Sequence, residues 1–138
     1  LRNAAASLPE GFTLQIIDKE IYSLCQREEW SRDLVSQYPD YESYSRLGTG
    51  VAVMAGRELA AGASSYATFQ DGIEVEVDTK RKYRRQGLAY ACSAKLILEC
   101  LEKNIYPCWD AHNRSSASLA EKLGYHYDRE YSAYILRA

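Results

Sequence analysis

Two neighbouring stretches of this chain carry residues that could do chemistry, and the first is an acidic strand pattern. Residues 73–79 alternate between apolar and acidic side chains, which places Glu74, Glu76 and Asp78 on one face of an expected strand. Clustered carboxylates raise one another's pKa, which suits a general base. Glu76 is our first choice for that base. A solvent-facing acidic strand edge, or a surface that binds a cationic substrate without taking its proton, is the alternative.

The second stretch is the basic turn 83–89, which joins this strand to a long helical pattern. The first turn of a helix leaves backbone N–H groups without partners, and such groups bind anions. Gly87 lets the backbone come close to a phosphate, and Ala89 keeps the next turn free of bulk. Arg84 and Arg85 add positive charge. The turn therefore predicts a bound pyrophosphate.

The residues just before this turn allow other interpretations. Lys80, Arg81 and Lys82 extend the basic run, and a run of this kind is typical of a solvated loop or of nucleic-acid contact. We expect solvation for these three residues, with some help toward a phosphate group of the ligand.

Composition narrows the class of partner. The 138 residues fit a single domain spanning 1–138, and Leu1 is not an initiator methionine, which is compatible with the C-terminal part of a longer protein. The net charge of −2 argues against a protein devoted to nucleic acid. No apolar run approaches the ~18 residues that span a bilayer, and no signal peptide is visible. Four cysteines without metal-ligand spacing predict reduced thiols in a cytoplasmic protein with no metal.

The elements that must position the acidic strand and the basic turn follow from periodicity and from turn residues. Residues 1–11 are expected to form a lead-in. Asp18 and Asp40 are expected to cap helices, and Gly48 and Gly124 to end them. The expected strands are 12–17, 51–54, 59–69, 73–79 and 106–109, with one or two more in 125–136. The expected helices begin near 19, 41, 87 and 114, the third with an apolar stripe of Leu88, Ala91, Ala94, Leu98 and Leu101. The order β-α-α-β-β-β-α-β-α-β(-β) predicts an α/β (α+β) sandwich with a mixed sheet.

Two motifs in this order resemble the GNAT superfamily of acetyl-CoA-dependent N-acetyltransferases. The first is Arg84-x-x-Gly87-x-Ala89 between a strand and a helix. The second is Asn113-x-x-Ser116, leading into a helix that ends in Lys-Leu-Gly-Tyr at 122–125. The resemblance runs from about Phe12 onward and implies a mostly antiparallel sheet flanked by helices. Further strings at 78–79 and 108–110 are similar to a bacterial, zwittermicin-resistance-like subgroup.

The resemblance also implies how acetyl-CoA would bind. It assigns the pyrophosphate to Arg84 and to the N–H groups of Arg85, Gln86, Gly87, Leu88 and Ala89, and it assigns the pantetheine arm to Val77, Asp78, Thr79, Asn113 and Ser116. A backbone N–H near Val77 would polarise the thioester carbonyl.

A departing thiolate takes up a proton, and the source of that proton is open here. Many relatives carry a tyrosine seven residues after the motif asparagine, where this chain has Ala120. Ser116, Tyr125 and water are the remaining donors, and unaided departure is the alternative.

We therefore expect an N-acetyltransferase that moves an acetyl group from acetyl-CoA to a primary amine of a small molecule by direct attack in a ternary complex. A CoA-binding regulatory module without turnover and a protein N-acetyltransferase are the alternatives. The acidic total makes nucleic acid the least favoured partner, and no membrane partner is expected. Exposed C-terminal strands could pair between subunits of a homodimer.

Overall fold

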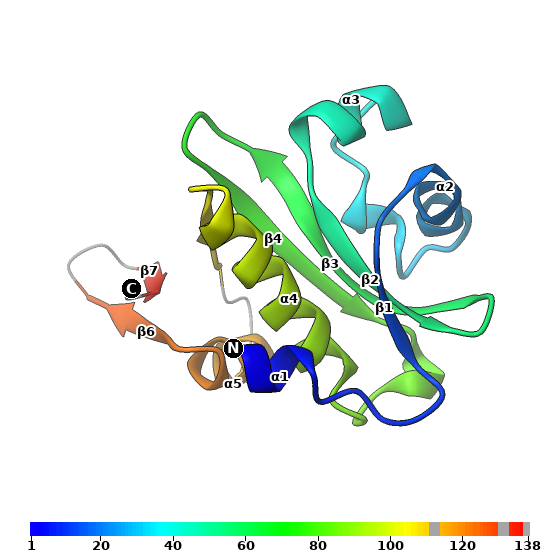
Figure 1. Cartoon of the computed structure of the whole chain (residues 1–138). Coiled ribbons are helices and arrows are strands. Elements are labelled where there is room, and N and C mark those ends of the chain that lie inside the picture. The colour runs from blue at the N-terminus through cyan, green and yellow to red at the C-terminus, as the bar shows by residue number, and fades with distance from the viewer. Residues whose placement is uncertain (111–113, 130–132, 137–138) are drawn as a thin grey trace.

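The computed structural model describes residues 1–110, 114–129 and 133–136 (Figure 1). Its elements follow the predicted order, with short additions, and are α1 (Arg2–Ala5), β1 (Thr13–Ile16), α2 (Lys19–Arg27), the 3-10 helix η1 (Arg32–Leu34), α3 (Tyr41–Leu47), β2 (Gly50–Ala55), β3 (Glu58–Thr68), β4 (Gly72–Thr79), the 3-10 helix η2 (Arg81–Tyr83), α4 (Leu88–Glu102), β5 (Tyr106–Cys108), α5 (Arg114–Lys122), β6 (Tyr125–Asp128) and β7 (Ala133–Leu136).

A mixed, mostly antiparallel sheet forms the centre of the molecule, as predicted. Its strand order is β1-β2-β3-β4-β5, in which β1 to β4 are antiparallel neighbours and β5 joins β4 in parallel. The hairpin between β3 and β4 turns at Asp71-Gly72, where the Phe69 N–H donates to the Gly72 carbonyl at 2.7 Å. The register places Val77 of β4 opposite Ala63 of β3.

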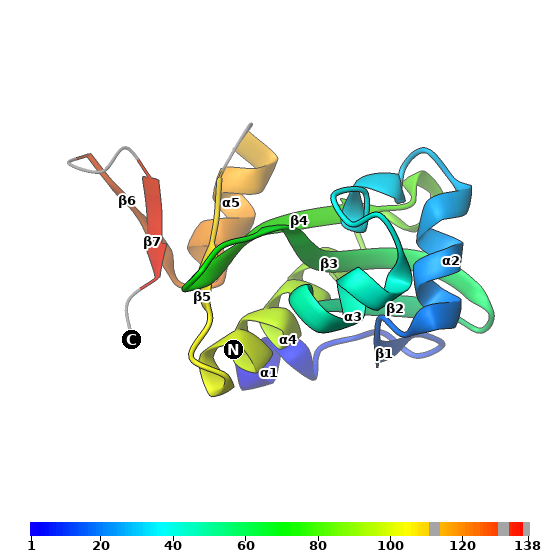
Figure 2. The same ribbon diagram turned by 90° about the horizontal axis from the view of Figure 1, so that it is seen from above.

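Helices cover both faces of this sheet because its strands are apolar on both sides. In β2, Val51 and Val53 pack toward α4, and Ala52 and Met54 pack toward α2 and η1. Figure 1 shows α4 crossing one face of the sheet, and the turned view of Figure 2 shows α2 and α3 separated from α4. The strand edge that leads into α4 is therefore held between two packed layers.

Local capping explains where the helices begin. The Asp18 carboxylate accepts the Ile21 N–H at 2.9 Å, and the Asp40 carboxylate accepts the Ser43 N–H at 2.8 Å. Both predicted caps are confirmed. Gly124 follows α5 with φ 103°, a left-handed conformation that favours glycine.

Two sequence-based expectations were wrong in detail. Part of the expected lead-in, residues 1–11, forms α1, whose Ala4 is buried in a cluster with α4 and α5. In the predicted stripe of α4, Leu88, Ala91 and Ala94 are buried, but Leu101 is 43% exposed.

The strands predicted within 125–136 are confirmed as β6 and β7. They pair with each other in a separate sheet, which lies apart from the central one in Figure 2.

Two further features are the burial of the cysteine thiols and the length of the helices. Burial raises the pKa of the Cys25 and Cys92 thiols to about 12, so both behave as small core residues. In the described parts of the chain, no helix is both long and apolar enough to cross a bilayer.

Candidate active site

The defining feature of the site is an edge of β4 that loses its partner strand. β4 pairs with β3 from Ile73 to Thr79, but β5 pairs only with the Gly72–Glu74 end of β4. Beyond β5, Trp109 forms a bridge with Tyr134 of β7 instead. Within the described residues, the other edge of β4 beyond Glu74 therefore has no neighbouring strand. Backbone polar groups on such an edge can pair with an extended ligand.

A cleft of about 950 Å³ opens along this edge. It is lined by β4 from Glu74 to Thr79, by the turn and the start of α4 (Tyr83, Arg84, Arg85, Gly87, Leu88, Ala89 and Tyr90), by Trp109 and Asp110, by α5 (Ser116, Ser118, Leu119 and Lys122) and by Trp30. Most of the predicted cofactor residues thus line one cavity. Gln86 is exposed and is not part of its lining.

One end of the cleft is formed by the turn that opens α4. Arg85 and Gly87 have positive φ angles of 66° and 78°, so the backbone passes twice through the left-handed region. α4 begins without a side-chain cap, and its first helical bond runs from the Ala91 N–H to the Gly87 carbonyl. The N–H groups of residues 88–90 precede that bond and have no partner within the helix. A Cβ built on Gly87 would meet no atom within 4 Å, so the space in front of the turn is open.

Positive charge lies beside these donors. Arg84 and Arg85 are both exposed and both line the cleft. The Arg84 Nε donates to the Thr79 carbonyl at 3.4 Å, which holds the side chain near the end of β4. Two cations and several orphan N–H groups at a helix start suit a pyrophosphate, as the sequence predicts.

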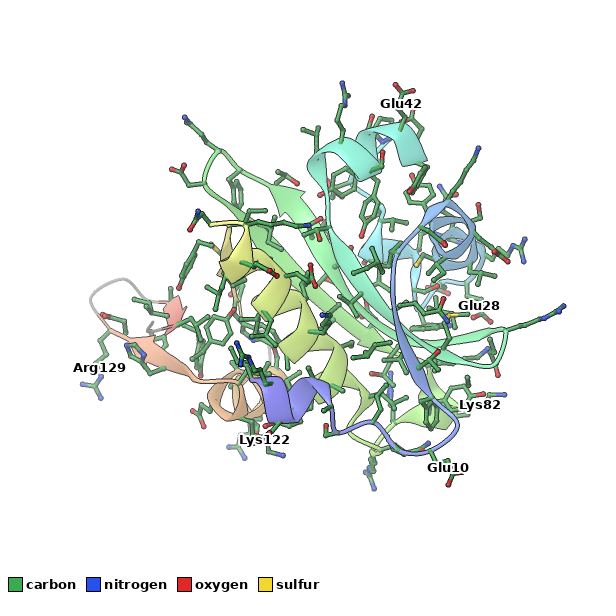
Figure 3. The ribbon with its side chains drawn as sticks, in the orientation of Figure 1. Glu10, Glu28, Glu42, Lys82, Lys122 and Arg129 are labelled. Atoms are coloured by element: carbon green, nitrogen blue, oxygen red, sulfur yellow. The ribbon has the colours of Figure 1, made fainter. Side chains whose placement is uncertain are left out.

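Lys80 is not simply solvated, which corrects the expectation for this residue, whereas Arg81 is exposed and the Lys82 side chain is 60% exposed. The Lys80 ammonium is 2.8 Å from a Glu58 carboxylate oxygen and 3.2 Å from one of Glu28, and its side chain is only 24% exposed. The Lys82 ammonium is 3.1 Å from Glu58. Glu28 and Lys82 lie toward the side of the molecule where the β2–β3 hairpin ends (Figure 3). Sequence reasoning missed Glu58, because it lies 22 residues before Lys80 and only the β3–β4 pairing brings the two together.

The acidic face of β4 contains a coupled pair of carboxyl groups. Burial, followed by the hydrogen bond and the negative charge of Asp78, raises the pKa of Glu76 to about 8. The pKa of Asp78 is also raised, by burial first, although its hydrogen bond with Glu76 works in the opposite direction. Among the described residues, Oδ2 of Asp78 is buried without a hydrogen-bond partner. We interpret the pair as sharing one proton at neutral pH, held on Glu76.

Of the two side chains predicted as proton donors, one lines the cleft and the other does not. Ser116 lines the cleft, and its carbonyl accepts the Trp109 indole N–H at 3.2 Å. Tyr125 is only 3% exposed, lies outside the cleft and donates its hydroxyl to the Pro107 carbonyl at 2.6 Å. Its proposed role as an acid is corrected on this ground. Ala120 is buried in the α4–α5 core, and Asn113 lies outside the described residues.

Two aromatic residues of the cleft were not predicted as site residues. Tyr90 lies three positions after Gly87, so counting along the first turn of α4 could have indicated it. Trp30 lies in the irregular segment between α2 and η1, and its indole N–H donates to Glu28 at 2.6 Å. Its place beside β4 depends on tertiary packing. Trp109, the other tryptophan, is 5% exposed.

Among the described residues, no group of three or more His, Cys, Asp and Glu side chains could hold a metal ion. What the described cleft offers is an open strand edge, a cationic helix start and a carboxyl pair. These features suit binding of an extended phosphate-bearing molecule and proton transfer beside it.

Comparison with known proteins agrees with this class of site. The family model of the GNAT acetyltransferases matches residues 1–134, and the chain belongs to this family. GNAT enzymes use acetyl-CoA as acetyl donor. The mixed sheet flanked by helices is thus the fold of the GNAT acetyltransferases.

Particular relatives are longer than this chain. An uncharacterized N-acetyltransferase from Bacillus subtilis, YdfB, is 33% identical over 136 residues, which cover 92% of this chain and 49% of that protein. The crystal structure of a GCN5-related N-acetyltransferase-like protein from Streptococcus suis is 45% identical and covers 99% of this chain and 51% of its own, with a TM-score of 0.88. The chain therefore spans about half the length of these two relatives.

More distant structures share the fold alone. A predicted acetyltransferase from Clostridium acetobutylicum, solved with acetyl-CoA, is 15% identical over 86% of this chain and 92% of its own, with a TM-score of 0.63. The ribosomal-protein-S18-alanine N-acetyltransferase of Escherichia coli is 16% identical over 85% of this chain and 79% of its own, with a TM-score of 0.61.

Proposed function

We propose that this chain is a single GNAT catalytic domain that transfers an acetyl group from acetyl-CoA to a primary amine of a small molecule. The observation that carries the proposal is the continuity of one cleft. The open edge of β4 and the uncapped start of α4, which residues 80–87 join, line one cavity, and Glu76 is part of the same lining. Binding of the donor and activation of the acceptor can then occur side by side.

The proposed donor site follows the length of acetyl-CoA. The pyrophosphate binds the N–H groups of residues 85–89 and the Arg84 and Arg85 side chains. The pantetheine arm pairs with the backbone of residues 77–79, where β5 no longer covers the strand. Ser116 and the motif residue Asn113 are assigned to the opposite wall, Ser116 because it lines the cleft and Asn113 by its place in the motif.

The proposed reaction is direct attack of the amine on the thioester carbonyl carbon. A C–N bond forms, the C–S bond breaks, and CoA leaves as a thiolate. Deprotonated Glu76 accepts the proton of the amine, directly or through water. The backbone N–H near Val77 stabilises the oxyanion that develops on the carbonyl oxygen. Ser116 and water are the remaining proton sources for the thiolate, since Tyr125 is buried elsewhere.

The acceptor is proposed to be cationic before it reacts. Glu74, Glu76 and Asp78 line the cleft, and the charges of Asp33 and Asp78 act on Glu76. Such a field attracts an ammonium group and disfavours an acidic acceptor.

We also propose that the protein belongs to the bacterial, zwittermicin-resistance-like subgroup and that its location is cytoplasmic. These two proposals rest on the strings at 78–79 and 108–110 and on the buried, unreactive thiols.

The test is calorimetric titration of the purified chain with acetyl-CoA and CoA. Gly87→Glu should abolish saturable binding, because the carboxylate enters the open space in front of the turn. Gly11→Glu is the matched control, since Gly11 also has a positive φ, of 93°, and open space around it but lies outside the cleft lining. Equal affinities of the two variants for CoA would contradict the pyrophosphate assignment. Binding without acetylation across an amine panel would instead favour a regulatory CoA-binding module.

A further inference from the structure

The hairpin between β2 and β3 is joined to the turn that opens α4 through one carboxylate. Glu58 is the first residue of β3, and it accepts hydrogen bonds from three residues of the opposite segment. These come from the Lys80 ammonium at 2.8 Å, from the Lys82 ammonium at 3.1 Å and from the Tyr83 hydroxyl. Those donors begin directly after β4 and end just before Arg84. One side chain thus contacts three of the four residues 80–83, which precede Arg84.

Other contacts fix the same segment. The Lys80 N–H donates to the Ala60 carbonyl at 2.8 Å, and the Lys80 side chain also reaches Glu28. The Tyr83 ring packs edge-on against Phe12, with ring centroids 5.6 Å apart. The hydrogen bonds from Lys80, Tyr83 and Lys82 lower the pKa of Glu58 to about 2, so this carboxylate is ionised at any physiological pH.

The basic run is therefore divided into two groups with different tasks. Lys80 and Lys82 are paired with carboxylates on the hairpin side. Arg84 and Arg85 line the cleft. On the proposed function, only the second group can meet the pyrophosphate, and its placement depends on where the first group is held.

We propose that Glu58 is a positioning residue for acetyl-CoA, which holds the turn of residues 80–87 so that the N–H groups and the arginines at its far end face the cleft. This inference rests on the proposed function. It predicts that removing the Glu58 charge weakens the binding of CoA, whereas electrostatics alone would predict stronger binding. Removing the Glu58 charge releases two lysine charges near an anion site, which by itself would strengthen binding of a polyphosphate. Loss of the anchor loosens the turn, which weakens binding.

The experiment compares Glu58→Gln with wild type by calorimetric titration with CoA and by competition binding of pantetheine, which lacks the nucleotide and the pyrophosphate. We expect the Kd for CoA to rise about 5- to 20-fold in Glu58→Gln, while the Kd for pantetheine changes less than about twofold. Once an acceptor is known, KM for acetyl-CoA should rise with little change in kcat. Arg57→Gln is the matched control, because within the described residues no ion pair joins Arg57 to the turn. It should leave both dissociation constants within about twofold of wild type.

Unchanged or tighter CoA binding by Glu58→Gln would overturn the inference and leave the proposed function standing. An equal loss of affinity for CoA and pantetheine would also overturn it, because that result indicates general disturbance of the fold. Glu58→Asp is the second variant, and partial recovery of CoA affinity relative to Glu58→Gln is expected. Wild type that does not bind CoA at all would reject the proposed function itself, and with it this inference.

Discussion

Glu76 and Asp78, two residues apart on β4, share a hydrogen bond on the face of the strand that lines the cleft. Adjacent positions on one strand face bring their carboxyl groups together, and partial burial makes two negative charges there costly. One proton shared by the pair is therefore the stable arrangement near neutral pH. Three of the predictions below depend on this relationship.

The first prediction concerns the pH dependence of acetyl transfer. Glu76 can accept a proton only when it is ionised, and its pKa is raised to about 8. We expect kcat/KM to rise with pH up to about 8 and then to lose this dependence. Glu76→Gln should lower kcat/KM by about 100-fold or more and remove the inflection near pH 8. Rates measured from pH 6 to 10 decide this, and an unchanged profile in Glu76→Gln would assign the inflection to another group.

The second prediction tests the influence of Asp78 on Glu76. Asp78→Asn removes the negative charge that raises the pKa of Glu76, so the inflection should move to lower pH by about one unit. Glu74→Gln is the matched control, because the charge of Glu74 is the smallest of the causes that act on Glu76. Its inflection should stay close to that of wild type. A larger shift in Glu74→Gln than in Asp78→Asn would contradict the pairing.

The third prediction is about stability without ligand. Because the folded-state pKa of Glu76 is raised, its contribution is fully present below pH 4.5 and is lost as pH rises toward 8. Glu76→Gln should therefore gain stability relative to wild type across this window. By pH 8 to 9 we expect about 1–2 kcal/mol, well below the full value of the shift, since the carboxyl group also contacts solvent. Urea unfolding at pH 5, 7 and 9 measures this gain.

The same series contains its own check. The pKa of Glu58 is lowered, so its contribution is lost only as pH falls below the ordinary glutamate range, outside the window used for Glu76. A stability difference between Glu76→Gln and wild type that stays constant from pH 5 to 9 would contradict the raised pKa of Glu76.

The fourth prediction separates stability from catalysis at Tyr125. The buried hydroxyl bonds the Pro107 carbonyl, and Tyr125→Phe leaves that acceptor without this donor. We expect a loss of about 1–2 kcal/mol in the free energy of unfolding and a change in kcat below twofold. Tyr127→Phe is the control, since Tyr127 lies on the same strand but is 52% exposed. It should change neither quantity. A tenfold fall in kcat for Tyr125→Phe would restore its role as an acid.

Much of the fold could be predicted because its signals are local. Asp18 and Asp40 cap the helices that follow them, Asp71-Gly72 turns a hairpin, and alternation along 73–79 puts the three carboxylates on one face of β4. The turn around Gly87 could be predicted from the sequence for the same reason. Its glycine, its arginines and the helix that it opens are contiguous in sequence.

The remaining site residues depend on pairings that bring distant segments together. Glu58 reaches Lys80 only because β3 and β4 are antiparallel neighbours. Trp30 comes to the cleft from an irregular segment that has no periodic pattern. Tyr125 occupies a position that the motif suggests is near the cofactor, but packing against Trp109 and the bond to Pro107 turn its hydroxyl into the core. Side-chain direction at a strand start is set by such packing rather than by spacing.

The end of the β4–β5 pairing, after which Trp109 bridges to Tyr134 of β7, has a consequence for amide hydrogen exchange. β4 is protected along its whole length on the β3 side but only at residues 72–74 on the β5 side, so its amide protons should exchange with solvent unevenly. A molecule lying along residues 75–79 would take the place of a missing strand and slow this exchange. The same molecule would tie the central sheet to the part of the chain that carries α5, β6 and β7. Occupancy of the cleft should therefore slow amide exchange along residues 75–79 and along α5 together.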